Sequence, residues 1–143
     1  MRHFKRGRKL NRTASHRSAL LSNLASSFII YKQIITTQPK AKELRKFAER
    51  LITYAKKDSL HGRRLILKNI KGKLNKKIAN ILIHELAPNY QDRNGGYTRI
   101  IKLDNRKNDN AQMSIIEFVD LKVEVDTQID KETVKETKSN KDN

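Results

Sequence analysis

No carboxylate occurs in this chain before Glu43, although the first 42 residues hold ten Lys and Arg side chains. The opening stretch, MRHFKRGRKLNRTASHR, supplies seven of these cations and only four apolar side chains, those of Met1, Phe4, Leu10 and Ala14. Such a segment cannot build a core, because charged side chains are almost never fully buried unless they are paired. The fold must therefore be made by later residues, with the beginning of the chain on the surface.

The whole chain is strongly basic. It has 143 residues with 32 Lys and Arg against 15 Asp and Glu, a formal net charge of +17, and 36% hydrophobic residues. This length fits one domain, and the low apolar fraction predicts a small core. Charge repulsion of this size opposes a compact state unless a polyanion neutralises it. A nucleic acid or an anionic membrane surface would do so, whereas a neutral small-molecule substrate gives no reason for the charge.

The charge also divides the chain into segments. Residues 43–120 hold seventeen bases and nine acids, whereas residues 121–143 hold five bases and six acids with only scattered Val and Ile. A segment without an apolar face cannot offset the entropy lost on ordering. We therefore expect a basic RNA-binding arm over residues 1–12, an α+β domain over residues 13–120 and a mobile, charged C-terminal extension over residues 121–143.

Apolar spacing predicts the first helix and strand. A helix capped by Thr13 or Ser15 should run to about Lys32. QIITTQ, rich in β-branched residues, follows as a short strand that Pro39 ends. The apolar face of the helix before this strand is expected to comprise Leu20, Leu21, Leu24, Phe28 and Tyr31.

The second helix has the clearest pattern, with Pro39 in its first turn. Its apolar positions recur at helical spacing and comprise Leu44, Phe47, Ala48, Leu51 and Ala55. A third helix capped by Asp58 or Ser59 should end near Asn69, and a fourth should end at Pro88. The runs YTRIIKL and QMSIIEFV should then pair as a hairpin. This order of helix, strand, three helices and two strands predicts an α+β fold with helices packed on a small mixed sheet.

The chain lacks the usual signs of an enzyme or a metalloprotein. It has no Cys, and its histidines lie far apart without the i, i+4 spacing of a ligand pair, at His3, His16, His61 and His84. The acids before residue 121 are scattered among Lys and Arg, and no Walker loop or nucleophile elbow is present. We therefore expect no catalytic residue, metal, cofactor or small-molecule substrate.

A membrane role is also disfavoured. The longest apolar run, ALLSNLASSFIIY, is interrupted by Asn23 and three serines and is far shorter than the ~20 residues of a membrane span. It also lacks a following small-residue cleavage site of the kind that ends a secretory signal. We therefore expect the basic start to be kept as part of the protein, with no membrane partner.

Arginine in the opening arm is the strongest functional signal. Arginine forks bind phosphate in pairs of hydrogen bonds and stack on bases, and Gly, Asn and His add flexibility and further donors. The later patches could equally be solvated faces of helices or loops. The candidate RNA-binding residues from this pattern are Arg2, His3, Lys5, Arg6, Gly7, Arg8, Lys9, Asn11, Arg12, His16 and Arg17 in the arm, and Arg63, Arg64, Lys68, Arg93 and Arg99 in the later patches.

A set of motifs in a fixed order resembles one bacterial family. MRH, GRKLNR, SHR, TTQPKAKELRKFAERLITYAK, RNGGYTRI and RKNDNAQMSIIEFVD follow one another over residues 1 to about 120. Together they resemble large-subunit ribosomal protein seventeen. The chain departs from this family at Asn108, where Gly is usual, and in the extension after residue 120.

The resemblance implies a structural protein of the large ribosomal subunit, located in the cytoplasm, that is bound to large-subunit rRNA and neighbouring ribosomal proteins near the polypeptide tunnel exit. It also implies an α+β fold with the order given above. It adds Lys40, Lys42, Gly96 and Tyr97 to the candidate RNA-binding residues.

Three other functions are alternatives for a chain of this charge. A DNA-compacting protein would share the charge and would bind duplex DNA as well. An RNA-modifying enzyme would need catalytic residues that the sequence does not show. A membrane-active helix would carry its cations on the face opposite the apolar one, whereas here the cations precede the apolar helix.

Overall fold

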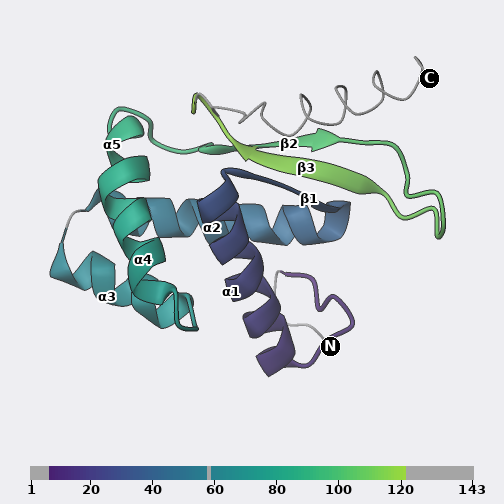
Figure 1. Cartoon of the computed structure of the whole chain (residues 1–143), viewed down its shortest axis with the longest axis horizontal. Helices are drawn as coiled ribbons and strands as arrows, with labels where there is room; N and C mark the ends of the chain where they lie inside the picture. Colours follow the sequence, from purple (N-terminus) through teal and green to yellow (C-terminus); the bar gives the residue numbers. More distant parts are fainter. Residues whose placement is uncertain (1–6, 58, 122–143) are drawn as a thin grey trace, which may run out of the picture.

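A computed structural model of the chain describes residues 7–57 and 59–121. Its elements follow the expected order of helix, strand, helices and hairpin, which confirms the α+β class (Figure 1). The elements are α1 (Ala14–Tyr31), β1 (Gln33–Thr37), α2 (Gln38–Lys56), α3 (Leu60–Asn69), α4 (Asn75–Asn80), the π-helical turn η1 (Ile81–Leu86), α5 (Ala87–Asn89), β2 (Thr98–Lys102) and β3 (Met113–Phe118).

The three strands form a sheet in the order β1-β3-β2. Both pairs are antiparallel. The predicted mixed sheet is therefore wrong, and the sheet is fully antiparallel. The hairpin brings β3 back beside β2, and β1 pairs with the other edge of β3, with Ile34 and Ile100 both opposite Ile116. The two strands that run in the same direction, β1 and β2, are kept apart by β3, which leaves no parallel pair.

The sheet buries one face against the helices. Ser114, Ile116 and Phe118 of β3 are buried, and they alternate with residues that are partly exposed. The opposite face carries Ile35, Ile115 and Ile101 side by side, and Ile35 is 64% exposed. The register therefore settles which Ile of each pair in the sequence faces the core.

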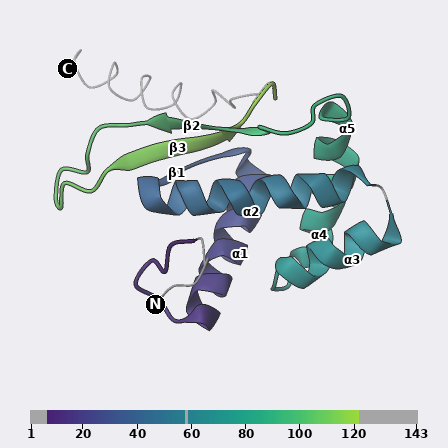
Figure 2. The same cartoon turned by 180° about the vertical axis from the view of Figure 1, so that it is seen from behind.

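Helix α2 crosses beneath the sheet and forms the middle of the core (Figure 2). Its predicted apolar set is confirmed: Leu44, Ala48, Leu51 and Ala55 are buried, and Phe47 is partly buried against them. Lysine, arginine and threonine side chains occupy its exposed positions. The 3.6-residue periodicity was sufficient here because this helix has one continuous apolar stripe.

Helix α1 packs differently from the expectation. Thr13 is its N-cap, and the Thr13 hydroxyl accepts a hydrogen bond from the His16 backbone N–H at 3.5 Å. Phe28 is buried as expected and stacks on Phe118 of β3, with ring centroids 4.1 Å apart. Tyr31, however, is 68% exposed and does not belong to the buried face.

Buried small residues replace part of the face predicted for α1. Ser22 and Ala25 lie in the core side of the helix, together with Ile29. The Ser22 hydroxyl accepts a hydrogen bond from the backbone N–H of Lys71, at 2.8 Å, and so joins α1 to the connection after α3. Small side chains at this crossing let the two segments approach closely.

The predicted fourth helix is one continuous helical segment, formed by α4, η1 and α5. It runs past Pro88, which lies in the first turn of α5, and ends at Asn89. The backbone N–H of Ala87 donates to the Leu82 carbonyl, five residues back. A proline ring clashes with the carbonyl four residues before it. The wide π turn gives that ring room, so the helical segment includes Pro88 and ends one residue later than expected.

The hairpin loop is closed by a compact turn. The Arg106 carbonyl accepts from the Asn110 N–H at 2.8 Å, and the Arg106 N–H donates to the Ala111 carbonyl at 2.9 Å. Asn110, with φ 52°, is the left-handed residue of this loop. Asn108, where the family usually has Gly, is not among the residues with positive φ.

Candidate nucleic-acid interface

The end of the arm folds back on the start of α1. The Arg17 guanidinium donates to the carbonyl oxygens of Lys9 and Arg12, at 3.4 and 3.1 Å, and the Arg12 N–H donates to the Lys9 carbonyl at 3.2 Å. The two residues between them, Leu10 and Asn11, have φ values of 54° and 50°. The left-handed region is costly for a residue such as Leu. Arg17 therefore has a structural task, since it clamps a strained turn.

Arg12 and His16 meet one helical turn apart. The Arg12 Nη1 lies 3.1 Å from His16 Nε2, and because a guanidinium can only donate, that imidazole nitrogen is the acceptor. The Arg12 Nε is buried and has no hydrogen-bond partner within the described residues. A charged donor left unpaired costs free energy, and an anionic oxygen would satisfy it.

Other candidates from the arm lie on the surface around this turn. Arg8, Lys9 and Asn11 are exposed, as is His16, whereas Gly7 is partly covered. Lys42 is exposed and Lys40 half-buried in the first turns of α2. Four further candidates lie outside the described residues: Arg2, His3, Lys5 and Arg6.

A second basic surface lies on α3, α4 and the connection between them. Residues 59–84 hold seven Lys and Arg and no carboxylate. Arg64 and Lys68 are exposed, and Arg63 donates to the Asn80 side-chain oxygen at 2.7 Å. Sequence reasoning missed four exposed lysines of this surface, although the acid-free run would have revealed them: Lys71, Lys73, Lys76 and Lys77.

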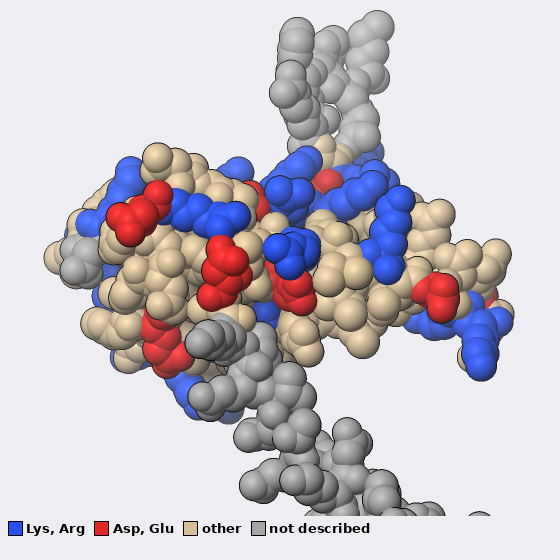
Figure 3. All heavy atoms as spheres, turned by 90° about the horizontal axis from the view of Figure 1, so that it is seen from above, with Lys and Arg blue, Asp and Glu red and all other residues tan. Residues whose placement is uncertain are grey.

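The arm and the α3–α4 connection lie on the same side of the molecule. Figures 1 and 2 show both on the side of the helical layer that faces away from the sheet. On the view from the sheet side, Lys and Arg are interspersed with Asp and Glu (Figure 3). The arm and the acid-free residues 59–84 thus lie away from the sheet, while basic and acidic side chains both occur on the sheet side.

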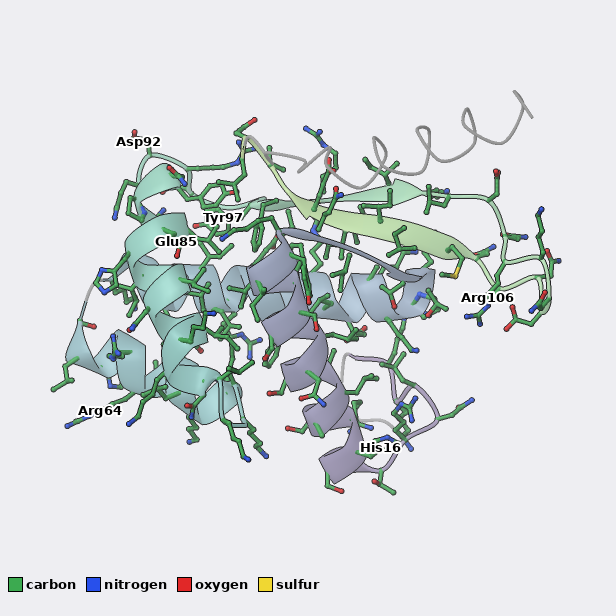
Figure 4. The ribbon with its side chains drawn as sticks, in the orientation of Figure 1. His16, Arg64, Glu85, Asp92, Tyr97 and Arg106 are labelled. Atoms are coloured by element: carbon green, nitrogen blue, oxygen red, sulfur yellow. The ribbon has the colours of Figure 1, made fainter. Side chains whose placement is uncertain are left out.

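The remaining candidates form a separate group near the start of β2. The Tyr97 ring is 4% exposed, packs edge-on against Tyr90 and lies beneath the Lys56 ammonium group, which is 5.4 Å from the ring centroid. Gly96 has φ 62° and precedes it in the turn. Figure 4 shows Tyr97 beside the sheet, far from His16 at the beginning of α1. The predicted RNA contact of Tyr97 therefore concerns a residue whose ring belongs to the core.

Two arginines of this group already have acidic partners. Arg93 Nη1 is 2.6 Å from an Asp120 oxygen, and Arg99 Nη1 is 3.5 Å from a Glu117 oxygen on the neighbouring strand. Both pairs are partly exposed, so each arginine remains accessible to solvent. Their charge is compensated locally, unlike that of the α3–α4 surface.

The described residues contain no arrangement typical of a metal centre. Within 7–57 and 59–121, no group of three or more His, Asp or Glu side chains is placed to hold a metal ion. None of the helices in this part of the chain is long and apolar enough to cross a bilayer.

Comparison with known proteins finds relatives that match most of the chain. The family model described as ribosomal protein L17 matches residues 20–119. The large ribosomal subunit protein bL17 of Methylacidiphilum infernorum is 52% identical over 128 residues, which cover 90% of this chain and 95% of that protein. The bL17 protein of Allorhizobium ampelinum is 47% identical over 134 residues, 94% of this chain and 93% of the relative.

A third relative, the bL17 protein of Amoebophilus asiaticus, is 53% identical over 120 residues, which cover 84% of this chain and 60% of that longer protein. The matched region of the family model includes every described helix and strand from the last two-thirds of α1 to the end of β3. The chain therefore belongs to the ribosomal protein L17 family.

Proposed function

We propose that this chain binds large-subunit rRNA through phosphate contacts of its arm and basic helical surface, near the polypeptide tunnel exit. Membership of the ribosomal protein L17 family makes it a structural constituent of the large ribosomal subunit and not an enzyme. Its partners are therefore components of the ribosome in the cytoplasm. In this proposal the helices and the sheet form a rigid platform, and the cations on it hold rRNA segments together in support of translation.

The observation that carries the proposal is the clamped turn of the arm. Arg17 holds the backbone of residues 9–12, and beside it the buried Nε of Arg12 has no hydrogen-bond partner among residues 7–57 and 59–121. Phosphate oxygens are strong acceptors for such a donor, and Arg8 and Lys9 next to it are exposed. An anion bound at these exposed cations would offset the repulsion between them.

The α3–α4 surface supports a second contact area in the same proposal. Its seven cations lack a carboxylate in the same stretch of chain, and it faces the same side as the arm. Each phosphate neutralised by Lys or Arg releases counterions, so such surfaces contribute affinity without reading sequence. A third, smaller contact would be formed near the start of β2 by Arg93, Gly96, Tyr97 and Arg99. There the Tyr97 hydroxyl and backbone would contact the RNA, because its ring is buried.

The division of labour along the chain is part of the proposal. Residues 1–12 act as the RNA-binding arm, residues 13–120 as the platform, and residues 121–143 as a charged, mobile extension. Nearly all of the extension and half of the arm lie outside the described residues. A chain that ends at residue 121 should still enter the subunit, because the removed segment has no excess of basic residues, and a chain that begins at Thr13 should not, because it lacks the basic arm.

The arm is tested by changing Arg8→Ala together with Arg12→Ala. This variant should incorporate into large subunits less well than the wild type in direct competition, while the melting temperature of the free protein changes little. Arg106→Ala with Lys107→Ala, which removes two cations from the hairpin loop, is the matched control. Equal incorporation of the arm variant and the wild type would refute the role of the arm.

The location is tested separately in assembled subunits. Photo-crosslinkers placed on the exposed Tyr31 and Ile35 should reach proteins or nascent chains at the tunnel exit. High salt should release the wild-type chain from the subunit, because the logarithm of the binding constant falls with the logarithm of the salt concentration. Crosslinks only to regions remote from the exit would refute the proposed location but not the proposed rRNA contact.

A further inference from the structure

A groove runs between the first turns of α2 and the hairpin end of β2 and β3. Its volume is about 930 Å³, near the upper end of the roughly 300–1,000 Å³ that is usual for ligand pockets. Figure 2 shows this end of α2 beneath the hairpin, with the arm on the other side of it. Arg8 of the arm lines the groove, so the groove continues directly from the clamped turn.

The groove carries an excess of unpaired positive charge. Its two carboxylates are already engaged: Glu49 accepts from Arg45 at 3.2 Å and from the Thr98 hydroxyl at 3.1 Å, and Glu43 lies 4.0 Å from the Lys46 ammonium group. The other cations of its lining have no acidic partner among the described residues. These are Arg8, Lys42 and Lys102.

Apolar and amide side chains complete the lining. Ile100, Leu103 and Met113 come from the two strands and the beginning of the loop, and Leu103 is 38% exposed. Three residues with amide side chains, Gln38, Asn105 and Gln112, also line the groove. An apolar surface accepts the face of a base, amides pair with base edges, and Lys and Arg bind the phosphates between them.

We propose that this groove binds a short unpaired segment of rRNA, with phosphates on Arg8, Lys42 and Lys102 and bases against Leu103 and Met113. The inference rests on the proposed rRNA-binding function and adds a site that recognises single-stranded nucleotides to it. None of the groove lining beyond Arg8 and Lys42 was among the residues expected from the sequence. In this site Arg8 would bind a phosphate together with residues of α2 and the hairpin, in addition to its proposed contact within the arm.

An unpaired segment suits the groove better than the two alternatives. A duplex hides its base faces and would leave Ile100, Leu103 and Met113 without a partner. An acidic peptide would use the cations, but its charged side chains would leave the apolar residues Ile100, Leu103 and Met113 without a partner. Single-stranded nucleotides use all three kinds of lining at once.

The test measures binding of the full chain to two probes by fluorescence anisotropy over a range of salt concentrations. One probe is a pool of random-sequence single-stranded RNA nonamers, and the other is a nine-base-pair RNA duplex. The groove variant is Lys42→Ala with Lys102→Ala. The matched control is Lys76→Ala with Lys77→Ala, which removes the same charge from exposed positions of α4.

The groove variant should bind the single-stranded pool about ten-fold more weakly than the wild type. Loss of two phosphate contacts should also lower its salt slope for this probe by about 1.4, since each contact contributes about 0.7 in single strands. The control pair should affect both probes alike. Leu103→Ser should weaken single-strand binding roughly three- to ten-fold with an unchanged slope, because it removes apolar contact and no charge.

Two results would overturn the inference. One is an equal effect of the groove and control pairs on both probes. The other is a deca-glutamate peptide that binds more tightly than the RNA pool and loses this affinity in the groove variant, which would assign the groove to an acidic protein segment. Failure of the proposed function is distinct, because it would appear as a wild-type chain that does not bind whole large-subunit rRNA.

Discussion

Replacing Tyr90 by Phe tests how the end of the sheet is fixed to the helices. The Tyr90 side chain is 1% exposed, and its hydroxyl donates to the Val119 carbonyl at 2.6 Å. Its ring packs on Tyr97 and, at a centroid distance of 6.5 Å, on Phe118. Phe at this position keeps the ring contacts and removes only the hydroxyl. The Val119 carbonyl then loses its donor in a buried setting.

The magnitude follows from that geometry. A typical intramolecular hydrogen bond contributes about 0.5–1.5 kcal/mol net, and a buried polar group left unpaired costs about 1–3 kcal/mol. We therefore expect Tyr90→Phe to lower the free energy of unfolding by about 1–3 kcal/mol at pH 7. For a domain of this size each kcal/mol corresponds to a fall in melting temperature of roughly 3–6 °C.

The assay is urea unfolding of the free chain, with Tyr31→Phe as the control. The chemical change is identical, but Tyr31 is 68% exposed, so this variant should lie within about 0.5 kcal/mol of the wild type. If the two variants unfold at the same urea concentration, the Tyr90 hydroxyl does not stabilise the fold and the reasoning is refuted.

Alkaline pH gives an independent check on the same hydroxyl. Burial, with a smaller contribution from the charge of Asp120, raises the pKa of Tyr90 from 10.0 to about 12, while Arg93 acts in the opposite direction. Between pH 10 and 12 the folded chain therefore keeps the Tyr90 proton that the unfolded chain loses. The stabilisation by the protonated hydroxyl is complete below pH 10 and disappears as the pH rises toward 12. The difference in unfolding free energy between wild type and Tyr90→Phe should shrink over this range. A constant difference would mean that the hydroxyl titrates normally.

Two further predictions concern the helix crossing and the hairpin loop. A Cβ at Gly62 would overlap the backbone carbonyl oxygen of Tyr54, so Gly62→Ala should lower stability by about 1–3 kcal/mol, and an unchanged urea midpoint would contradict the close packing of α2 and α3. Hydrogen bonds from Arg106, and then from the Ala111 N–H, lower the pKa of Asp109 from 3.8 to about 2. Any stabilisation from this carboxylate is therefore present above pH 3.8 and is lost as the pH falls through 2. Carbon NMR of the carboxyl group should give that midpoint, Arg106→Ala should raise it, and a normal midpoint in the wild type would contradict the paired loop.

Several features of the candidate interface followed from residue chemistry alone. An acid-free, Arg-rich start predicts a surface arm for a polyanion, since such a segment can neither be buried nor neutralise itself. The positions of Arg8, Lys9 and Asn11 on the surface agree with that expectation. The family resemblance, confirmed by the comparisons, supplied the ribosome as the setting.

Other roles depend on contacts between residues that no local pattern reveals. Arg17 is of a residue type that commonly binds phosphate, but in this structure its guanidinium donates to two backbone carbonyls and holds the turn of the arm. Tyr97 follows a glycine turn, yet its ring lies in the core. The groove joins residues from the arm, α2 and the hairpin, and its arm and hairpin residues are more than 90 positions apart in the chain.

The sequence by itself determined what short-range periodicity can express. The stripe of α2, a cap at Thr13 or Ser15, a cap at Asp58 or Ser59 and the two strands of the hairpin were all predicted from short stretches of sequence. The structure agrees with each and has Thr13 and Ser59 as the caps. The tertiary structure decided everything that needs a partner from elsewhere in the chain. It placed β3 between β1 and β2, turned Ile116 inward and Ile115 outward, left Tyr31 exposed and widened the helix before Pro88. An apolar residue shows only that it can be buried; the face that buries it is chosen when strands and helices from distant parts of the chain come together.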